Sequence, residues 1–345
     1  MFSSTEHEIP DTPEALYDFI SEKRWGDGLP VIPPTEDRVR AMVDGAGRDA
    51  GEELGILGPV DAPCTVEKVA INAVMAGCKP EYLPVVLAAV EGIIEPQFNA
   101  KGIQATTNPV GVMVVVNGPV RQALEINCRR GCLGPGWRAN ATIGRALRLV
   151  MINVGGALPG KVDKAVHGFP GKYSFCFGED EEGNPWSPLH VERGFDAGQS
   201  AVTVCGIQDQ SNSLTTDVVD AETLLKVAAP CIATPASNNT LSGGGEPVVL
   251  ITRGHAEMLH RQGWSKEKCQ QYLYDHATVP LEALGDARYP GKPPQPVNGL
   301  VRAVKRPQDI MLIVAGGDEH YHLQVMHTFG EDTIAVTRPV RSVGG

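Results

Sequence analysis

The sequence contains neither a long apolar run nor a basic run. No apolar stretch approaches the length of about 20 residues that a helix needs to cross a bilayer. The first residues lack the basic and apolar regions of a secretory signal peptide. With a formal net charge of −11 and no basic patch, the chain is poorly suited to bind nucleic acid, because phosphates require a positively charged surface. We therefore expect a cytoplasmic protein that binds neither membranes nor nucleic acids.

Disulfides and repeats are not expected either. Cysteines of cytoplasmic proteins stay reduced, so the eight cysteines should be free thiols. The hydrophobic fraction of 42% and the charged fraction of 21% are typical of a globular chain. No period of roughly 20–50 residues marks a repeat protein. A chain of 345 residues is too long for one ordinary hydrophobic core, which favours two lobes.

Hydrophobic periodicity predicts a mixed fold. Apolar residues recur at helical spacing over 66–74, and this helix should stop at Gly77, whereas the β-branched run 112–117 is typical of a strand. Other expected helices are 12–23, 36–43, 80–94, 141–153, 220–229, 254–262 and 265–277, and other expected strands are 173–177, 201–207, 247–252, 309–314 and 333–337. We predict an α/β (or α+β) fold with two lobes, 1–198 and 199–345, each with a mixed sheet covered by helices.

The clearest functional signal is a glycine-rich loop that leads into an arginine-bearing helix, residues 128–149. Asn140 is a good N-cap residue, and the free N–H groups of a helix start attract anions. Arg138 precedes this start and Arg145 follows it, so these three residues are candidates to bind a small anionic substrate. Alternatively, the arginines pair with carboxylates of this acidic chain.

Two loops partly match nucleotide-binding motifs. Residues 134–139 fit the letters of a dinucleotide fingerprint, but no strand directly precedes them. Residues 155–162 match a P-loop except at Val162, which cannot supply the hydroxyl that holds magnesium. Neither a nicotinamide cofactor nor a nucleotide is expected.

A second segment rich in reactive side chains covers residues 167–179. His167 and Glu179 are candidates for proton transfer, and Lys172 and Tyr173 are candidates for substrate binding, because strand ends hold such groups rigidly. The segment could equally be a surface hairpin. The acidic residues 180–182 are expected to be a solvated run.

Cys78 is the most interesting thiol. A position at a helix start beside Lys79 lowers a thiol pKa, which makes Cys78 a candidate catalytic thiolate, although it could also be an inert buried cysteine. Cys128 and Cys132 share the glycine loop, but their spacing matches neither a redox motif nor a zinc motif.

Two further groups are weaker candidates. His320 and His322 lie on one face of an extended segment and could help to bind a divalent or transition metal, but no third ligand is fixed by the sequence. Asn238 and Asn239 precede a triple glycine, as in a flexible loop that contacts substrate. We expect the glycine loop, the 167–179 segment and the 238–245 loop to line one cleft.

Long motifs spread over nearly the whole chain are residues 27–35, 72–84, 134–149 and 315–317. Together they resemble a bacterial family whose members occur alone or fused to a domain with a selenocysteine- or cysteine-Gly-Ser-Cys motif (UGSC-type). The resemblance implies a link to thiol or selenol redox chemistry. This chain lacks the Gly-Ser-Cys motif, so a redox centre of that kind would belong to a partner protein.

These observations favour an enzyme for a small anionic organic molecule, most simply a lyase or hydro-lyase. The alternatives are a partner subunit of a thiol- or selenol-dependent reductase and a simple binding protein. A homo-oligomer is expected.

Overall fold

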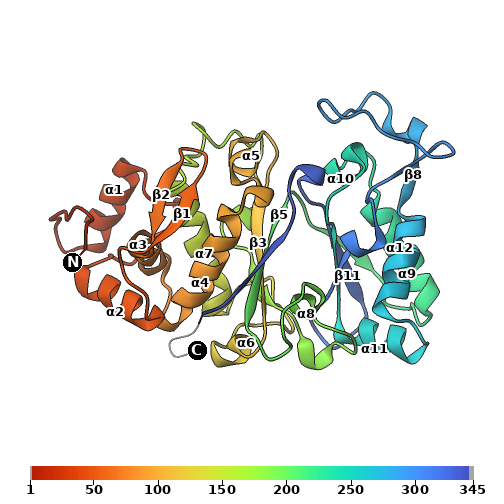
Figure 1. Ribbon diagram of the computed structural model, residues 1–345, viewed down its shortest axis with the longest axis horizontal. Coiled ribbons are helices and arrows are strands. Elements are labelled where there is room, and N and C mark those ends of the chain that lie inside the picture. Colours follow the sequence, from red (N-terminus) through yellow and green to blue (C-terminus); the bar gives the residue numbers. More distant parts are fainter. Residues whose placement is uncertain (1, 342–345) are drawn as a thin grey trace.

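The computed structural model describes residues 2–341, which form four layers in the order helices, sheet, sheet, helices (Figure 1). Both central sheets have four strands, and each contains parallel and antiparallel pairs. The predicted α/β class, with mixed sheets covered by helices, is confirmed.

The two sheets repeat one pairing pattern. The first has the order β12-β5-β3-β4, formed by Val336–Pro339, Ala201–Ile207, Gly111–Asn117 and Cys176–Gly178. The second has the order β10-β7-β11-β6, formed by Met311–Val314, Val248–Ile251, His322–Met326 and Ser211–Leu214. In each, one edge pair is parallel, β3 with β4 or β7 with β10, and the other pairs are antiparallel. Two small ribbons are β1–β2 and β8–β9, formed by Glu53–Leu57, Ala62–Thr65, Thr278–Pro280 and Leu300–Arg302.

The chain exchanges one strand between the sheets. Strand β6 follows β5 in the chain but pairs with β11 of the second sheet, and β12 follows β11 but pairs with β5 of the first. Ile207 and Thr328 form a β-bridge where the two connections meet. Strands from both sides of residue 198 therefore build the first sheet.

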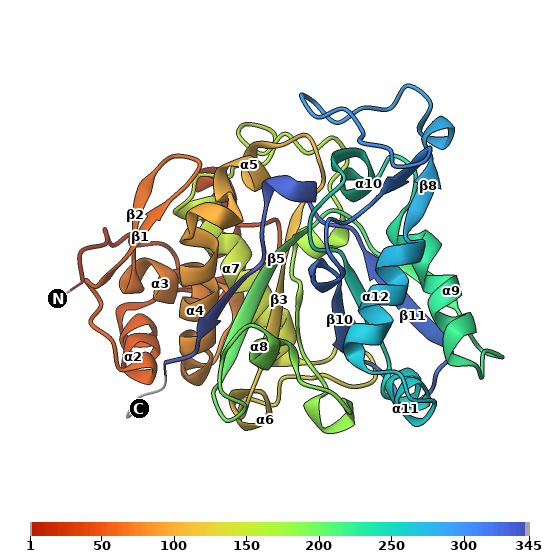
Figure 2. The ribbon, with the colours of Figure 1, turned by 45° about the vertical axis from the view of Figure 1, so that its right-hand side comes forward.

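Helices cover the two outer faces (Figures 1 and 2). Helices α4 and α7, Leu83–Ile94 and Arg138–Asn153, pack on the first sheet, and α2 and α3, Glu36–Ala46 and Val66–Ala76, lie outside them. The second sheet is covered by α9 and α12, Ala221–Ile232 and Lys266–His276, with α11, Arg253–Arg261, beside them. The remaining helices are α1, α5, α6, α8 and α10, formed by Pro13–Lys23, Ala100–Ala105, Val120–Ala123, Leu189–Glu192 and Asn238–Ser242. No helix within residues 2–341 is both long and apolar enough to cross a membrane.

Strand β3 illustrates how the sequence builds the layers. Val112, Val114 and Val116 point into the core shared with the helices, whereas Met113 and Val115 point into the core between the two sheets. Because side chains alternate along a strand and both faces are covered, this strand reads as a continuous apolar run.

Candidate functional site

The carboxyl ends of both parallel strand pairs meet at one end of the two sheets. Just after β4, the backbone N–H of Asp180 donates to the carbonyl of Val314, the last residue of β10, at 2.7 Å. The N–H of Gly316, after β10, donates to the carbonyl of Cys128 at 2.9 Å. Loops from the two sheets are thus bonded to one another where ligands of open α/β sheets bind.

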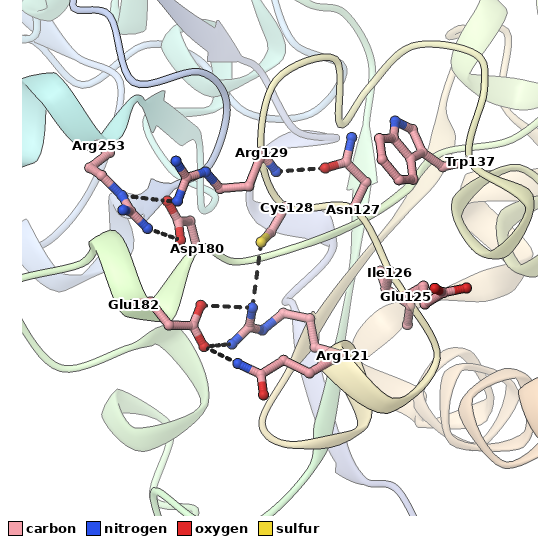
Figure 3. A pocket seen from close by; sticks show the side chains of 11 residues that line it. Arg121, Glu125, Ile126, Asn127, Cys128, Arg129, Trp137, Asp180, Glu182 and Arg253 are labelled. Carbon is pink, nitrogen blue, oxygen red and sulfur yellow. Dashed lines mark hydrogen bonds and ion pairs between the residues drawn. The ribbon is translucent and has the colours of Figure 1, made fainter.

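An open cleft of about 390 Å³ lies at this end (Figure 3). It is lined by Arg121, Gln122, Glu125, Ile126, Asn127, Cys128, Arg129, Trp137, Asp180, Glu182 and Arg253. Of the three segments predicted to line one cleft, only the glycine loop 131–140 contributes to this lining, through Trp137, while Cys128 and Arg129 line it from the residues just before that loop. The prediction of a cleft shared by all three segments is therefore wrong for this cleft.

Arg121 donates hydrogen bonds both to the thiol of the cleft and to one of its carboxylates. Its guanidinium donates to both oxygens of Glu182, at 2.7 and 3.1 Å, and to the Sγ atom of Cys128 at 3.4 Å. Gln122 also donates to Glu182, at 2.6 Å. The hydrogen bond from Arg121 lowers the pKa of Glu182, although partial burial opposes this.

Two further guanidiniums surround Asp180. Arg253 donates to its two carboxylate oxygens at 2.9 and 3.1 Å, and Gly183 N–H adds a third bond at 3.2 Å. Arg129 lies 3.5 Å from the same carboxylate and forms an ion pair with Asp318 from the loop after β10. Asp180 is 1% exposed, so the prediction of a solvated acidic run is wrong at this residue.

Cys128 lies between polar and apolar walls. Burial raises the pKa of its thiol, and the nearby charge of Arg121 partly offsets that rise. Ile126 and Trp137 provide apolar surface at the same cleft, and the Trp137 side chain is exposed. A molecule in the cleft would therefore meet a thiol, paired charges and an aromatic ring.

One group of side chains could hold a metal ion among residues 2–341. The Sγ atom of Cys128 and carboxylate oxygens of Asp180 and Glu182 lie within 4.8 Å of one another. Both carboxylates are already paired with guanidiniums, Asp180 with Arg253 and Glu182 with Arg121. A cation would have to displace these guanidiniums, so the set fits a metal poorly.

The predicted N-cap at Asn140 is wrong. Helix α7 begins at Arg138 and Asn140 is its third residue. Its side chain instead accepts from the N–H of Asn127 at 2.8 Å and donates to the carbonyls of Asn127 and Cys132, at 2.9 and 3.1 Å. Asn140 is buried and fastens the loop that carries Cys128 to the helix.

The two predicted anion-binding arginines bind other parts of the chain. Arg145 donates to both carboxylate oxygens of Asp27, at 2.7 and 2.9 Å, and to the carbonyl of Pro30 at 2.9 Å. Arg138 donates to the carbonyl of Gly77 at 3.0 Å. Neither lines the cleft. For Arg145 the geometry follows the alternative of internal pairing, and its bonds hold the proline-rich segment against α7.

The prediction of a low-pKa thiol at Cys78 is also wrong. The residue follows the end of α3 and is buried, with its Sγ atom donating to the carbonyl of Thr142 at 3.3 Å. Burial raises the pKa of Cys78 to about 12. The hydrogen bond to Thr142 and the charges of Arg138 and Arg145 lower the pKa of Cys78 by less than burial raises it.

His167 and Glu179 do not share a site. His167 is exposed, whereas Glu179 is completely buried beside the cleft. Glu179 accepts from the side chains of Asn117 and Asn184, at 2.7 and 2.9 Å, and from the N–H of Leu189 at 2.8 Å. These three bonds connect β3, the segment after β4 and the start of α8, which is the role of a structural carboxylate.

Lys172 and Tyr173 also lie outside the cleft. Lys172 forms an ion pair with Asp163 at 2.7 Å, and Arg148 pairs with the same carboxylate at 2.8 Å. Burial lowers the pKa of Lys172, and the hydrogen bond to Asp163 opposes this change. Tyr173 is exposed.

Asn238 and Asn239 are buried and belong to α10. Asn239 accepts from the N–H of Thr328 at 2.8 Å and donates to its hydroxyl at 2.8 Å and to the carbonyl of Gly244 at 3.0 Å. It thereby fixes the point where the two sheets exchange strands. These contacts are structural, and neither asparagine lines the cleft.

Within the described part of the chain, the two candidate metal-binding histidines belong to no group of three possible metal ligands. His322 is exposed and contacts Asn212 at 3.1 Å. His320 lies near His255, with ring centroids 6.2 Å apart. The Cys128–Asp180–Glu182 group contains neither His320 nor His322.

Sequence reasoning missed the charged residues that define the cleft. Arg253 and Asp180 follow strands β7 and β4 within two residues, and Arg121 lies four residues after β3, in helix α6. A search extended to all charged residues within four positions after each predicted strand would have included these three.

Comparison of the chain with protein-family models, with curated proteins and with solved structures found no match.

Proposed function

We propose that this chain is an enzyme that acts on a small organic anion in the Cys128 cleft, through a lyase or hydro-lyase reaction. The observation that carries the proposal is the convergence of one thiol and three guanidiniums on a single cleft at the strand ends. Arg121 and Arg253 are paired with Glu182 and Asp180, whereas the closest partner of Arg129 is the exposed Asp318. Guanidiniums bind carboxylates with two parallel hydrogen bonds. Titratable groups gathered in a cleft are typical of an active site.

Cys128 is the group best placed to transfer a proton. It lines the cleft, whereas His167 does not, and the oxygens of Glu179 are already bonded to protein donors. Burial favours the neutral thiol, and the Arg121 N–H at 3.4 Å stabilises the thiolate that forms when the thiol gives its proton to the solvent in the open cleft. General acid–base catalysis requires a group that exchanges a proton in this way.

The reaction that follows is an elimination. The Cys128 thiolate takes the proton from the carbon next to the substrate carboxylate. The electron pair of that C–H bond forms a carbon–carbon double bond, and the group on the neighbouring carbon leaves with its own bonding pair. No oxidant or reductant enters this step. A reducing compartment such as the cytoplasm suits the proposal, because Cys128 and the other seven cysteines are free thiols.

Deuterium exchange tests the proposal without knowledge of the leaving group. The full chain is incubated in D₂O with a panel of hydroxy-, amino- and thio-carboxylates, and NMR follows the signal of the carbon-bound proton next to each carboxylate. We expect at least one compound to exchange or eliminate in the absence of added reductant.

Two results would contradict the proposal. Absence of exchange across the panel would leave a binding protein as the better description. Turnover that requires an added dithiol would instead favour the alternative of a partner subunit in a thiol- or selenol-dependent reductase.

A further inference from the structure

The three guanidiniums of the cleft differ in how firmly they are held. Arg121 and Glu182 share two hydrogen bonds, and Arg121 is buried. Arg253 and Asp180 also share two hydrogen bonds, and Asp180 is 1% exposed. Separating either pair would remove the closest partner of a buried charge and leave only a more distant one, Glu181 at 3.6 Å from Arg121 or Arg129 at 3.5 Å from Asp180, which is costly. These two arginines are therefore unable to change partners easily.

Arg129 is held differently. Its side chain is 38% exposed, and its close ion-pair partner is Asp318, whose side chain is 64% exposed. The nearest oxygen of the buried Asp180 is 3.5 Å away. Exposed ion pairs are weak and are screened by salt, because water stabilises both charges when they separate. Arg129 is thus the guanidinium of the cleft that can exchange its partner for a ligand.

We propose that Arg129 binds the substrate carboxylate, which takes the place of the Asp318 carboxylate that pairs with Arg129 in the structure. This inference rests on the proposed function and specifies which residue anchors the anion. Cys128 and Arg129 line the same cleft, so a carboxylate bound to Arg129 shares that cleft with the thiol. That placement brings the carbon next to the carboxylate toward the proton-transferring group.

The loop that carries Asp318 is tethered beside the cleft. Gly316, two residues before Asp318, donates its N–H to the carbonyl of Cys128 at 2.9 Å and forms a parallel bridge with Arg129. A tethered group competes with a free ligand at a high effective concentration. Substrate therefore displaces the Asp318 side chain while the backbone bonds of Gly316 stay in place.

Malonate is a suitable probe, and isothermal titration of the full chain at low salt measures its affinity. Replacing Asp318 with Asn removes the internal competitor, so we expect D318N to bind malonate roughly two- to fivefold more tightly than wild type. Replacing Arg129 with Met removes the anchor, so R129M should bind at least about tenfold more weakly. E319Q is the matched control, because Glu319 carries the same charge on the same loop but pairs with Arg130, which does not line the cleft.

Each outcome has a defined meaning. Tighter binding by D318N with unchanged binding by E319Q supports the inference. An equal gain in both variants would show a general effect of charge and would overturn the role of Asp318. If wild type binds malonate and R129M binds it equally well, Arg129 is not the anchor, although the proposed function survives. If neither wild type nor D318N binds malonate, the anion site itself is contradicted.

Discussion

Burial of His255 should make the protein less stable as the pH falls below neutrality. The ring is completely buried at the start of α11, where its Nδ1 atom accepts from the N–H of Thr252 at 3.3 Å and its Nε2 atom contacts the Thr215 hydroxyl at 3.0 Å. The pKa of His255 is lowered to about 4, mainly by removal from water; a backbone hydrogen bond to His320 opposes this shift, and the charges of His320 and His322 contribute to it. Protonation at Nδ1 would also break the bond from Thr252.

The sign and size of the effect follow from proton linkage. Because the folded pKa lies below the ordinary value of 6.5, the unfolded chain binds the proton first, and stability is lost as the pH falls from about 6.5 to about 4. The loss is complete below that range. At about 1.4 kcal/mol per pKa unit, the total is about 3.5 kcal/mol, of which about 2 kcal/mol is lost between pH 7 and pH 5.

Urea unfolding at pH 7 and pH 5 measures this loss. His255→Asn keeps an acceptor for Thr252 but does not titrate, so its free energy of unfolding should fall by about 2 kcal/mol less than that of wild type over this range. His260→Asn is the matched control, since His260 is exposed on the same helix, and it should behave like wild type. Equal pH dependence in wild type and His255→Asn would refute the reasoning.

Two other changes separate the structural roles found here from the roles predicted by the sequence. Replacing Arg145 with Met leaves the buried Asp27 carboxylate without its guanidinium partner. We therefore expect the free energy of unfolding by urea to fall by about 3 kcal/mol, with malonate affinity unchanged. A stable R145M variant that no longer binds malonate would restore the anion site at α7. Burial and a pKa of about 12 should make Cys78 react with iodoacetamide at pH 8 more slowly than the half-buried Cys231, as measured by peptide mass spectrometry. Faster labelling of Cys78 would contradict its assignment to the core.

The sequence predicted elements whose signal is local. Strand β5 was expected at 201–207 and spans Ala201–Ile207, and helix α3 ends where Gly77 adopts a left-handed conformation with φ 91°. Periodic apolar residues and a glycine stop signal are properties of a few neighbouring residues. The predicted strand at 173–177 is instead Cys176–Gly178, because element boundaries depend on the partner strand.

Charge pairing could not be predicted in the same way. Arg145 binds Asp27, 118 residues earlier in the chain, and Arg129 binds Asp318, 189 residues later. Which carboxylate neutralises which arginine depends on the tertiary fold, so an arginine beside a helix start does not by itself define an anion site. The exchange of β6 and β12 between sheets is equally non-local.

The location of the cleft could be predicted in part from the sequence. The glycine loop was recognised, and both Trp137 of that loop and Cys128 at its start do line the cleft. The sequence marks Asn140 as a helix N-cap that helps to bind an anion, but its side chain instead bonds backbone groups of the loop beside the cleft. The carboxylate chosen for chemistry, Glu179, neighbours the cleft carboxylate Asp180 in sequence, and the fold decides which of the two lines the cleft.

The central claim is that Cys128 transfers the substrate proton. The most direct measurement is the deuterium-exchange rate of Cys128→Ser against Cys231→Ser, which changes a cysteine on α9 outside the cleft. The account predicts that Cys128→Ser loses exchange by roughly 100-fold or more while Cys231→Ser keeps the wild-type rate. Equal rates in the two variants, with both folded, would contradict it.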